Sequence, residues 1–142
     1  MLDAVAADDV VDAVAGVDVA VMPIGASTLN HVLSTPNKLF EALAAGVPAV
    51  VSDFPEMRRI VLGDPAGPLG GVCDPASPAS VAAAIRAVLD QPAAELAAMR
   101  ARCRQAADSR WNWETEVAHL VDLYASLEAV AGSRGVVAGD RP

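Results

Sequence analysis

The sequence predicts an α/β protein built around a parallel sheet, and two observations carry this prediction. Three short apolar segments, at 18–22, 47–52 and 71–73, have the length and composition of buried strands. Stretches with the apolar spacing of helices separate them. Strands that alternate with helices usually run parallel, because each helix carries the chain back across the sheet.

Glycines, prolines and capping residues divide the chain into its expected elements. In chain order these are a helix from Asp8 or Asp9 to Ala15, a strand at 18–22, a loop at 24–35, a helix from Pro36 that ends at Gly46, a strand at 47–52, a short helix at 55–61, a loop at 62–69, a strand at 71–73, and helices at 78–90, 92–107 and 113–130. The last helix has apolar residues at helical spacing, among them Leu120, Tyr124 and Leu127.

The length of 142 residues corresponds to one domain. We expect that domain to span 1–131. The Gly, Ser, Arg and Asp content of 132–142 predicts a flexible tail. A domain of this size buries about two-thirds of the surface of its unfolded chain, so a hydrophobic core is expected.

Composition excludes several classes of partner. The net charge of −8 argues against nucleic acid and anionic membranes as the main partner. No run of 18 apolar residues and no cationic leader are present, so we expect no transmembrane segment, no secretory signal and a cytoplasmic location. Cys73 and Cys103 are interpreted as free thiols of a reducing compartment.

Lys38 is the only lysine in the chain, and it lies at a predicted helix start. Thr35 is expected to cap this helix, with Pro36 as its first residue. At about 100° per residue, Asn37, Lys38 and Glu41 share a polar face, and the opposite face is apolar. The first N–H groups of a helix lack internal partners and attract anions, and an ammonium group suits phosphate.

These residues together predict a site for a nucleoside diphosphate. Lys38 and the N–H groups near Thr35, Asn37 and Lys38 would take the diphosphate, and a carboxylate one turn further along suits sugar hydroxyls. The competing interpretation is an ordinary surface helix with an i,i+3 pair between Lys38 and Glu41, which contributes only a few tenths of a kcal/mol. Similarly, Arg58 and Arg59 could reach phosphate, but a solvated arginine pair is the more common outcome.

Three segments of the chain resemble a known enzyme family. They are DVAVMP at 18–23, PNKLFEALAAGVP at 36–48 and VVSD at 50–53, with weaker similarity at GVCDP (71–75), Ala84-Ile85 and Trp113-Glu114. They resemble the C-terminal donor-binding domain of the GT-B glycosyltransferases, in particular the retaining family 4. The resemblance covers about residues 8 to 128. It implies a partial Rossmann-like parallel sheet, the C-terminal half of a GT-B donor domain, with C-terminal helices.

The resemblance also implies a donor site. The family's helix glutamate binds the donor ribose, and Glu41 is its counterpart by position. A second glutamate of the family, near the donor hexose, corresponds here to Leu33, so hexose contacts are not carried over. The expected donor-binding residues are Glu41, Lys38, Asn37, Thr35, Ser34 and Leu39, followed by Asn30 and His31.

No metal and no cofactor are expected at this site. The chain has no Asp-x-Asp pair, and its two histidines, His31 and His119, lack ligand spacing around them. Helix dipole and lysine would neutralise the diphosphate instead. The nucleotide-diphosphate sugar is then the donor substrate and not a cofactor.

The implied function is that of a hexosyltransferase of which this chain is a fragment. The first strands of the donor domain and the whole acceptor domain are absent, so we expect the fragment alone to be inactive. The acceptor and any catalytic base would lie in that missing N-terminal part. Self-association through an open sheet edge and the apolar face of the last helix is also expected. Two alternatives stay open: a non-enzymatic remnant or interaction module, and part of a related nucleotide-sugar enzyme such as an epimerase.

Overall fold

The structure, a computed structural model, describes residues 4–135. The chain divides into two compact units, one that ends at Asp108 and one that begins at Ser109. The first unit contains the whole sheet, and the second contains the last helix. None of the described helices is long and apolar enough to cross a membrane.

Three parallel strands form the sheet, as the sequence predicts. They are β1 (Ala20–Met22), β2 (Ala49–Ser52) and β3 (Gly70–Cys73), in the spatial order β1-β2-β3. The register places Val50 opposite Val21 on one side and opposite Gly71 on the other. All four residues of β2 are buried, as expected for the central strand of a sheet covered on both faces.

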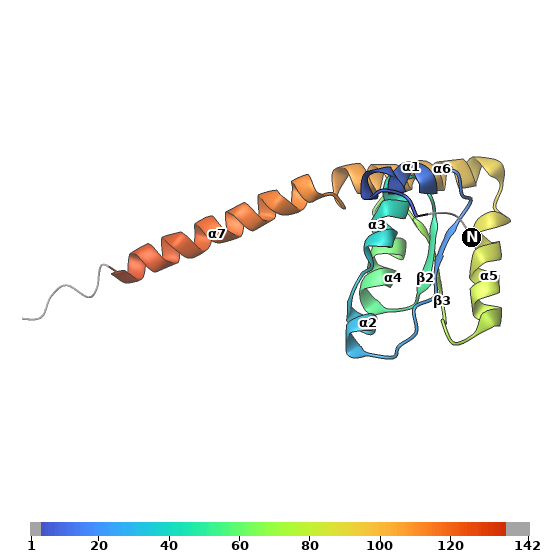
Figure 1. Ribbon diagram of the computed structural model, residues 1–142, viewed down its shortest axis with the longest axis horizontal. Helices are drawn as coiled ribbons and strands as arrows, with labels where there is room; N and C mark the ends of the chain where they lie inside the picture. Colours follow the sequence, from blue (N-terminus) through green and yellow to red (C-terminus); the bar gives the residue numbers. More distant parts are fainter. Residues whose placement is uncertain (1–3, 136–142) are drawn as a thin grey trace, which may run out of the picture. The chain divides into compact units, whose positions relative to one another are not determined.

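Helices cover both faces of this sheet (Figure 1). The helices of the chain are α1 (Val10–Val14), α2 (Leu29–Leu33), α3 (Asn37–Ala44), α4 (Pro55–Leu62), α5 (Pro78–Leu89), α6 (Ala93–Ser109) and α7 (Trp113–Gly135). In Figure 1, α3 and α4 lie on one face of the sheet and α5 lies on the other. The α/β class and the Rossmann-like arrangement are therefore confirmed.

The core has buried apolar residues on both faces of the sheet. Val50 packs with Cys73, Val88 and Met99 on the side of α5. Side chains alternate along a strand, so Ala49 and Val51 point to the opposite face. Other fully buried residues belong to α3, α4 and the segments beside them: Leu39, Leu43, Met57, Val61, Val47 and Leu69.

Two expectations about local structure are wrong. The segment 24–35 is not all loop, because α2 forms within it. The Thr28 hydroxyl accepts a hydrogen bond from the His31 N–H at 3.2 Å, and this cap stabilises a single turn. The first helix is also preceded by a 3₁₀ turn over Ala7–Asp9, and Asp9 makes no side-chain cap.

The last helix continues past the predicted domain boundary at 131. It ends at Gly135, and the rest of the predicted tail, residues 136–142, lies outside the described residues. The division into a domain at 1–131 and a tail at 132–142 stays a prediction. The contacts within the chain instead separate it at Asp108.

Helix α6 holds the loops that precede the strands. Arg100 donates to the carbonyl oxygens of Val17 at 3.0 Å and Asp18 at 3.4 Å, just before β1. Arg102 donates to Pro68 O at 3.2 Å, just before β3. The loops before β1 and β3 are therefore tied to α6, and open parallel sheets generally bind ligands at the other end, outside the carboxyl ends of their strands.

Both cysteines are free and buried. The Cys103 thiol lies 3.4 Å from the carbonyl oxygen of Leu69, and burial raises the pKa of this thiol to about 11. Burial also raises the pKa of Cys73, and the nearby carboxylates of Asp74 and Asp53 add to the effect. At neutral pH both side chains are therefore protonated parts of the core.

Adjacent glycines in β3 give a matched test of the packing at this edge. A Cβ at Gly70 would overlap the carbonyl oxygen of Ala49, which is backbone and cannot move aside. A Cβ at Gly71 would meet Ala84 O at an ordinary 3.8 Å. We predict that Gly70→Ala lowers the free energy of unfolding by about 3 kcal/mol or more, and Gly71→Ala by less than about 1 kcal/mol. Urea denaturation measures both, and equal losses would contradict the register of β3 on β2.

Candidate donor site at the carboxyl ends of the strands

The candidate site lies where open parallel sheets bind ligands, outside the carboxyl ends of the strands. From β1 the chain runs through α2 to the first residues of α3. From β2 and β3 it runs directly into Asp53 and Asp74. Backbone N–H groups, one lysine and several carboxylates are therefore offered at the same end of the sheet.

The start of α3 differs by one residue from the prediction. Pro36 has extended backbone angles, φ −78° and ψ 143°, so Pro36 and not Thr35 is the cap, and the helix begins at Asn37. The Leu39 N–H donates to Pro36 O at 3.0 Å. Among the described residues, the N–H groups of Asn37 and Lys38 have no backbone acceptor, as expected for the first turn of a helix.

The apolar face of α3 and its C-terminal end hold the first turn of the helix in position. Leu39, Ala42 and Leu43 are buried. After the helix, Gly46 has φ +70°, its N–H donates to Leu43 O at 2.9 Å, and the Val47 N–H donates to Ala42 O at 2.8 Å. This Schellman closure leads the chain directly into β2. The Leu39 side chain thus belongs to the core, and any contact of Leu39 with a ligand stays a prediction.

The polar face of α3 points outward. Asn37 and Lys38 are exposed, and Glu41 is half-buried one turn further along. Within residues 4–135, neither Lys38 nor Glu41 forms a salt bridge, so the surface pair that the competing interpretation requires is absent. Both charges remain available to a ligand.

The chain before α3 adds a second set of polar groups. Asn30 and His31 are exposed on α2, and the Ser27 hydroxyl lies 2.9 Å from His31 Nδ1. The Ser34 N–H donates to Asn30 O at 2.9 Å, which joins the end of α2 to the segment before Pro36. Ser34 and Thr35 are half-buried in that segment. The structure thus places these predicted residues on one continuous stretch that leads to the helix start.

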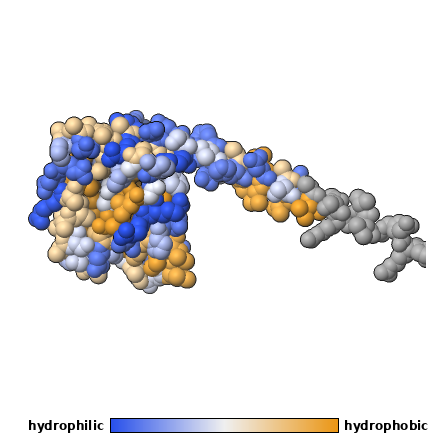
Figure 2. Space-filling model, turned by 180° about the vertical axis from the view of Figure 1, so that it is seen from behind, coloured by the Kyte–Doolittle hydropathy of each residue, from blue (hydrophilic) through white to orange (hydrophobic). Residues whose placement is uncertain are grey.

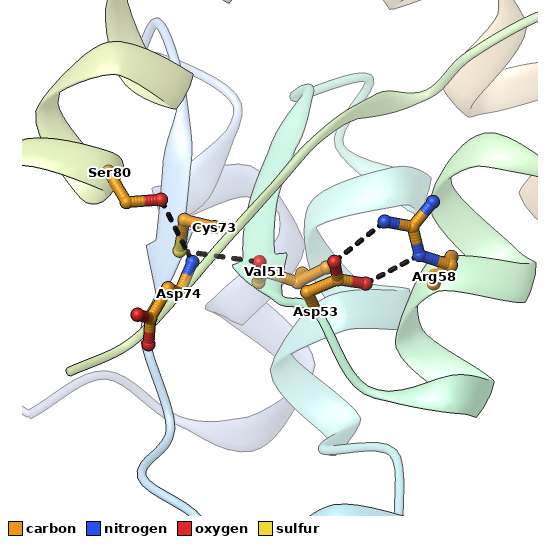
Figure 3. Close-up of polar contacts among 6 residues, drawn as sticks. All are labelled: Val51, Asp53, Arg58, Cys73, Asp74 and Ser80. Atoms are coloured by element: carbon orange, nitrogen blue, oxygen red, sulfur yellow. Dashed lines mark hydrogen bonds and ion pairs between the residues drawn. The ribbon is translucent and has the colours of Figure 1, made fainter. Parts of the chain in front are cut away.

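Two aspartates at the same end were not predicted as site residues. Asp53 accepts a bidentate pair of hydrogen bonds from Arg58, at 2.5 and 2.6 Å (Figure 3). The Asp74 N–H donates to Ser80 Oγ at 3.0 Å, also drawn in Figure 3. Each aspartate directly follows the buried last residue of a strand, and this position at a strand end is the sequence signal that identifies them.

Arg58 and Arg59 are both engaged by carboxylates. Arg58 pairs with Asp53, and Arg59 pairs with Glu56 at 2.7 Å. Neither is free to serve as a phosphate ligand without giving up a partner, which agrees with the expectation of a solvated pair. The pairing also lowers the pKa of Asp53, chiefly through the hydrogen bonds from Arg58 and further through its charge.

A concave surface of the described residues lies elsewhere on the sheet. A hollow of about 460 Å³ runs along β3, between α5 and α6, and is lined by Gly70, Val88, Met99 and Arg102 among others. No residue of α2 or α3 contributes to it. In the described part of the chain, no cluster of three or more His, Cys, Asp or Glu side chains could hold a metal ion.

Comparison with known proteins identifies the family of the chain. Residues 1–91 match the family described as "Glycosyl transferases group 1". Glycogen synthases of two strains of Mycobacterium tuberculosis are 40% identical over 95 residues, which is 66% of this chain and 21% of theirs. The matched part of this chain therefore spans about a fifth of the length of these relatives. No solved structure matches the chain at a significant level.

The Asp53–Arg58 pair predicts a defined titration. Because the pKa of Asp53 is lowered in the folded protein, the pair stabilises the fold above the ordinary pKa of an aspartate and loses this contribution as the pH falls through the lowered pKa. In Arg58→Ala, the pKa of Asp53 measured by carboxyl ¹³C NMR should rise towards its ordinary value. Arg59→Ala is the matched control and should leave it unchanged. If the pKa of Asp53 is the same in Arg58→Ala as in the unchanged protein, the pairing is contradicted.

Proposed function

Because the chain belongs to the group 1 glycosyl transferases, we propose that it supplies donor binding for transfer of a hexosyl group from a nucleotide-diphosphate sugar. The observation that carries the proposal is the start of α3. There the only lysine of the chain is exposed, unpaired with any described carboxylate, and next to two N–H groups that lack backbone acceptors.

The diphosphate would lie at the start of α3. The macrodipole of a helix places about half a positive charge at its first turn, and the N–H groups of Asn37 and Lys38 add directed donors. The ammonium group of Lys38 supplies a full charge within reach of the same place. In a chain with a net charge of −8, this local concentration of positive potential is what an anionic donor needs.

The ribose would lie beside the first turn. Glu41 follows Lys38 by three residues, which is about 4.5 Å along the helix axis. Its carboxylate can accept hydrogen bonds from two neighbouring hydroxyl groups, and its half-buried position limits how far it can move. Asn30, His31, Ser34 and Thr35 would contribute further polar contacts from the stretch before Pro36.

The contribution to catalysis is electrostatic. Sugar transfer leaves a nucleoside diphosphate on which negative charge develops as the glycosidic bond breaks. Donors and a cation already fixed at that position stabilise this charge without having to reorganise. An acceptor site is also needed, and we assign it to residues outside this chain, since the matched segment covers only 21% of the relatives. On this account the chain binds donor, and transfer needs the missing part.

A binding module without transferase activity is the alternative that the short match to the relatives favours. A single comparison separates the two functions. Donor binding is measured by NMR on this chain, and sugar transfer is measured after joining the chain to an upstream donor-domain half and an acceptor domain. Binding with transfer supports the enzyme, binding without transfer supports the module, and no binding contradicts both.

Glu41 is predicted to contribute to donor affinity. Glu41→Ala should lose about 1.5–3 kcal/mol of binding free energy, the range for hydrogen bonds to a charged group, which is about a ten- to hundredfold weaker dissociation constant. Isothermal titration calorimetry with a nucleotide sugar measures this loss. Asp90→Ala, at the exposed end of α5, removes an equal charge from the opposite end of the sheet and serves as the control. An unchanged affinity in Glu41→Ala would remove the ribose assignment.

Lys38 is predicted to discriminate between ligands by their phosphates. Lys38→Ala should weaken binding of the nucleoside diphosphate far more than binding of the free nucleoside, because only the diphosphate presents charge at the helix start. Lys38→Arg should restore part of the loss, since the guanidinium group keeps the charge but is longer and planar. Arg86→Ala, which removes a cation from exposed surface on α5, controls for net charge. Equal losses for both ligands would make Lys38 a structural residue.

A further inference from the structure

Ser52 is a buried polar residue that the proposed donor site does not use. Among the described residues it is the only polar side chain that is buried, and its exposed fraction is 0%. It is the last residue of β2, the central strand of the sheet. Burying a hydroxyl group costs free energy unless the group is hydrogen-bonded, so the partner of Ser52 indicates what the residue does.

The partner of Ser52 lies in the loop that follows β1. The hydroxyl donates to Ile24 O at 2.7 Å, and Met22 O lies 3.4 Å from the same hydroxyl oxygen. The register explains this contact, because Met22 pairs with Val51 and β2 therefore extends one residue beyond the end of β1. The Ile24 N–H donates to Met22 O at 3.0 Å, which closes a three-residue turn at Pro23. The hydroxyl thus ties the first turn of the loop to the central strand.

This contact is the long-range attachment of the polar stretch before α3. Within residues 4–135, no other hydrogen bond joins residues 23–35 to a distant part of the chain, since the remaining ones are local. Apolar burial adds little, because α2 contacts α4 but its Leu29 and Leu33 are 73% and 55% exposed. In Figure 2, hydrophobic atoms reach the surface at the corner of the sheet-containing unit where Figure 1 places α2. The stretch therefore depends on Ser52 far more than α3 does, which is held by its own buried leucines.

We propose that Ser52 is a positioning residue for donor binding, an inference that rests on the proposed function. Its side chain is fully buried and does not touch the donor. Its hydroxyl fixes the loop after β1, and through this loop it holds the polar residues of 30–35 beside the start of α3. Without the hydroxyl the stretch occupies other positions for part of the time, and the donor binds only the fraction of molecules in which the stretch is in place.

Donor affinity is the first test. Ser52→Ala removes the hydroxyl without adding atoms and should weaken the dissociation constant for a nucleotide sugar, measured by isothermal titration calorimetry, about five- to tenfold. Cys103→Ala is the control, because it removes a buried thiol that lies 3.4 Å from Leu69 O, just before β3 at the other end of the sheet, and should leave the affinity unchanged. Urea denaturation establishes that both variants are folded under the assay conditions. An unchanged affinity in folded Ser52→Ala overturns the inference.

A double-mutant cycle separates positioning from a general loss of stability. The double variant Asn30→Ala with His31→Ala removes polar side chains from the stretch, and Lys38→Ala removes the cation on α3. The loss of affinity caused by the Asn30 and His31 changes should be smaller in Ser52→Ala than in the unchanged chain, because Ser52 acts through these residues. The loss caused by Lys38→Ala should be the same in both. Additive losses from Ser52→Ala and the double variant would show that Ser52 does not act through the stretch, and would overturn the inference.

Mobility of the free chain is the third test, and it needs no ligand. In Ser52→Ala, the ¹⁵N order parameters of residues 24–35 should fall, while those of residues 39–44 on α3 should stay as they are in the unchanged chain. Unchanged order parameters along 24–35 would mean that the stretch is held without the hydroxyl, and would overturn the inference. The proposed function fails by a different result, which is that the unchanged chain binds no nucleotide sugar; in that case the inference about donor positioning falls with it.

Discussion

Burial of the apolar face of α3 is the interaction on which the candidate site depends. Leu39 and Leu43 are fully buried, and each contributes about 1.5–3 kcal/mol of hydrophobic stabilisation. The closure at Gly46 ties the end of the helix to β2, the central strand. With one face and one end fixed, α3 cannot rotate without exposing these leucines. The first turn and Lys38 are therefore held towards solvent before any ligand arrives.

The polar groups at the two ends of the sheet have different hydrogen-bond partners. At the amino ends, arginines of α6 donate to carbonyl oxygens before β1 and β3, and Arg104 lies against Gly46 before β2. At the carboxyl ends, Asp53 pairs with Arg58, and the Ser52 hydroxyl donates to the carbonyl oxygen of Ile24. Lys38 and Glu41 at the same end form no salt bridge among the described residues.

The sequence predicts most of the fold because the strands are apolar runs and α3 has a clean polar and apolar face. It does not predict α2, since Ser27 and Asn30 suggest a loop and the turn depends on the Thr28 cap. The cap of α3 shifts by one residue because Pro36 adopts an extended ψ, which its identity alone does not specify. The Asp53–Arg58 pair spans a strand-to-helix turn, where no periodic pattern reveals which side chains meet.

NMR chemical-shift mapping of donor binding to the ¹⁵N-labelled chain tests most directly the claim that the donor binds at the start of α3. On addition of a nucleoside diphosphate sugar, the account predicts the largest amide shift changes at Asn37 and Lys38, with smaller changes along Ser34 to Glu41. The amides of Gly71 and Met99, beside the separate hollow along β3, should not respond. Shift changes centred on that hollow, or none at the start of α3 at saturating donor, would contradict the account.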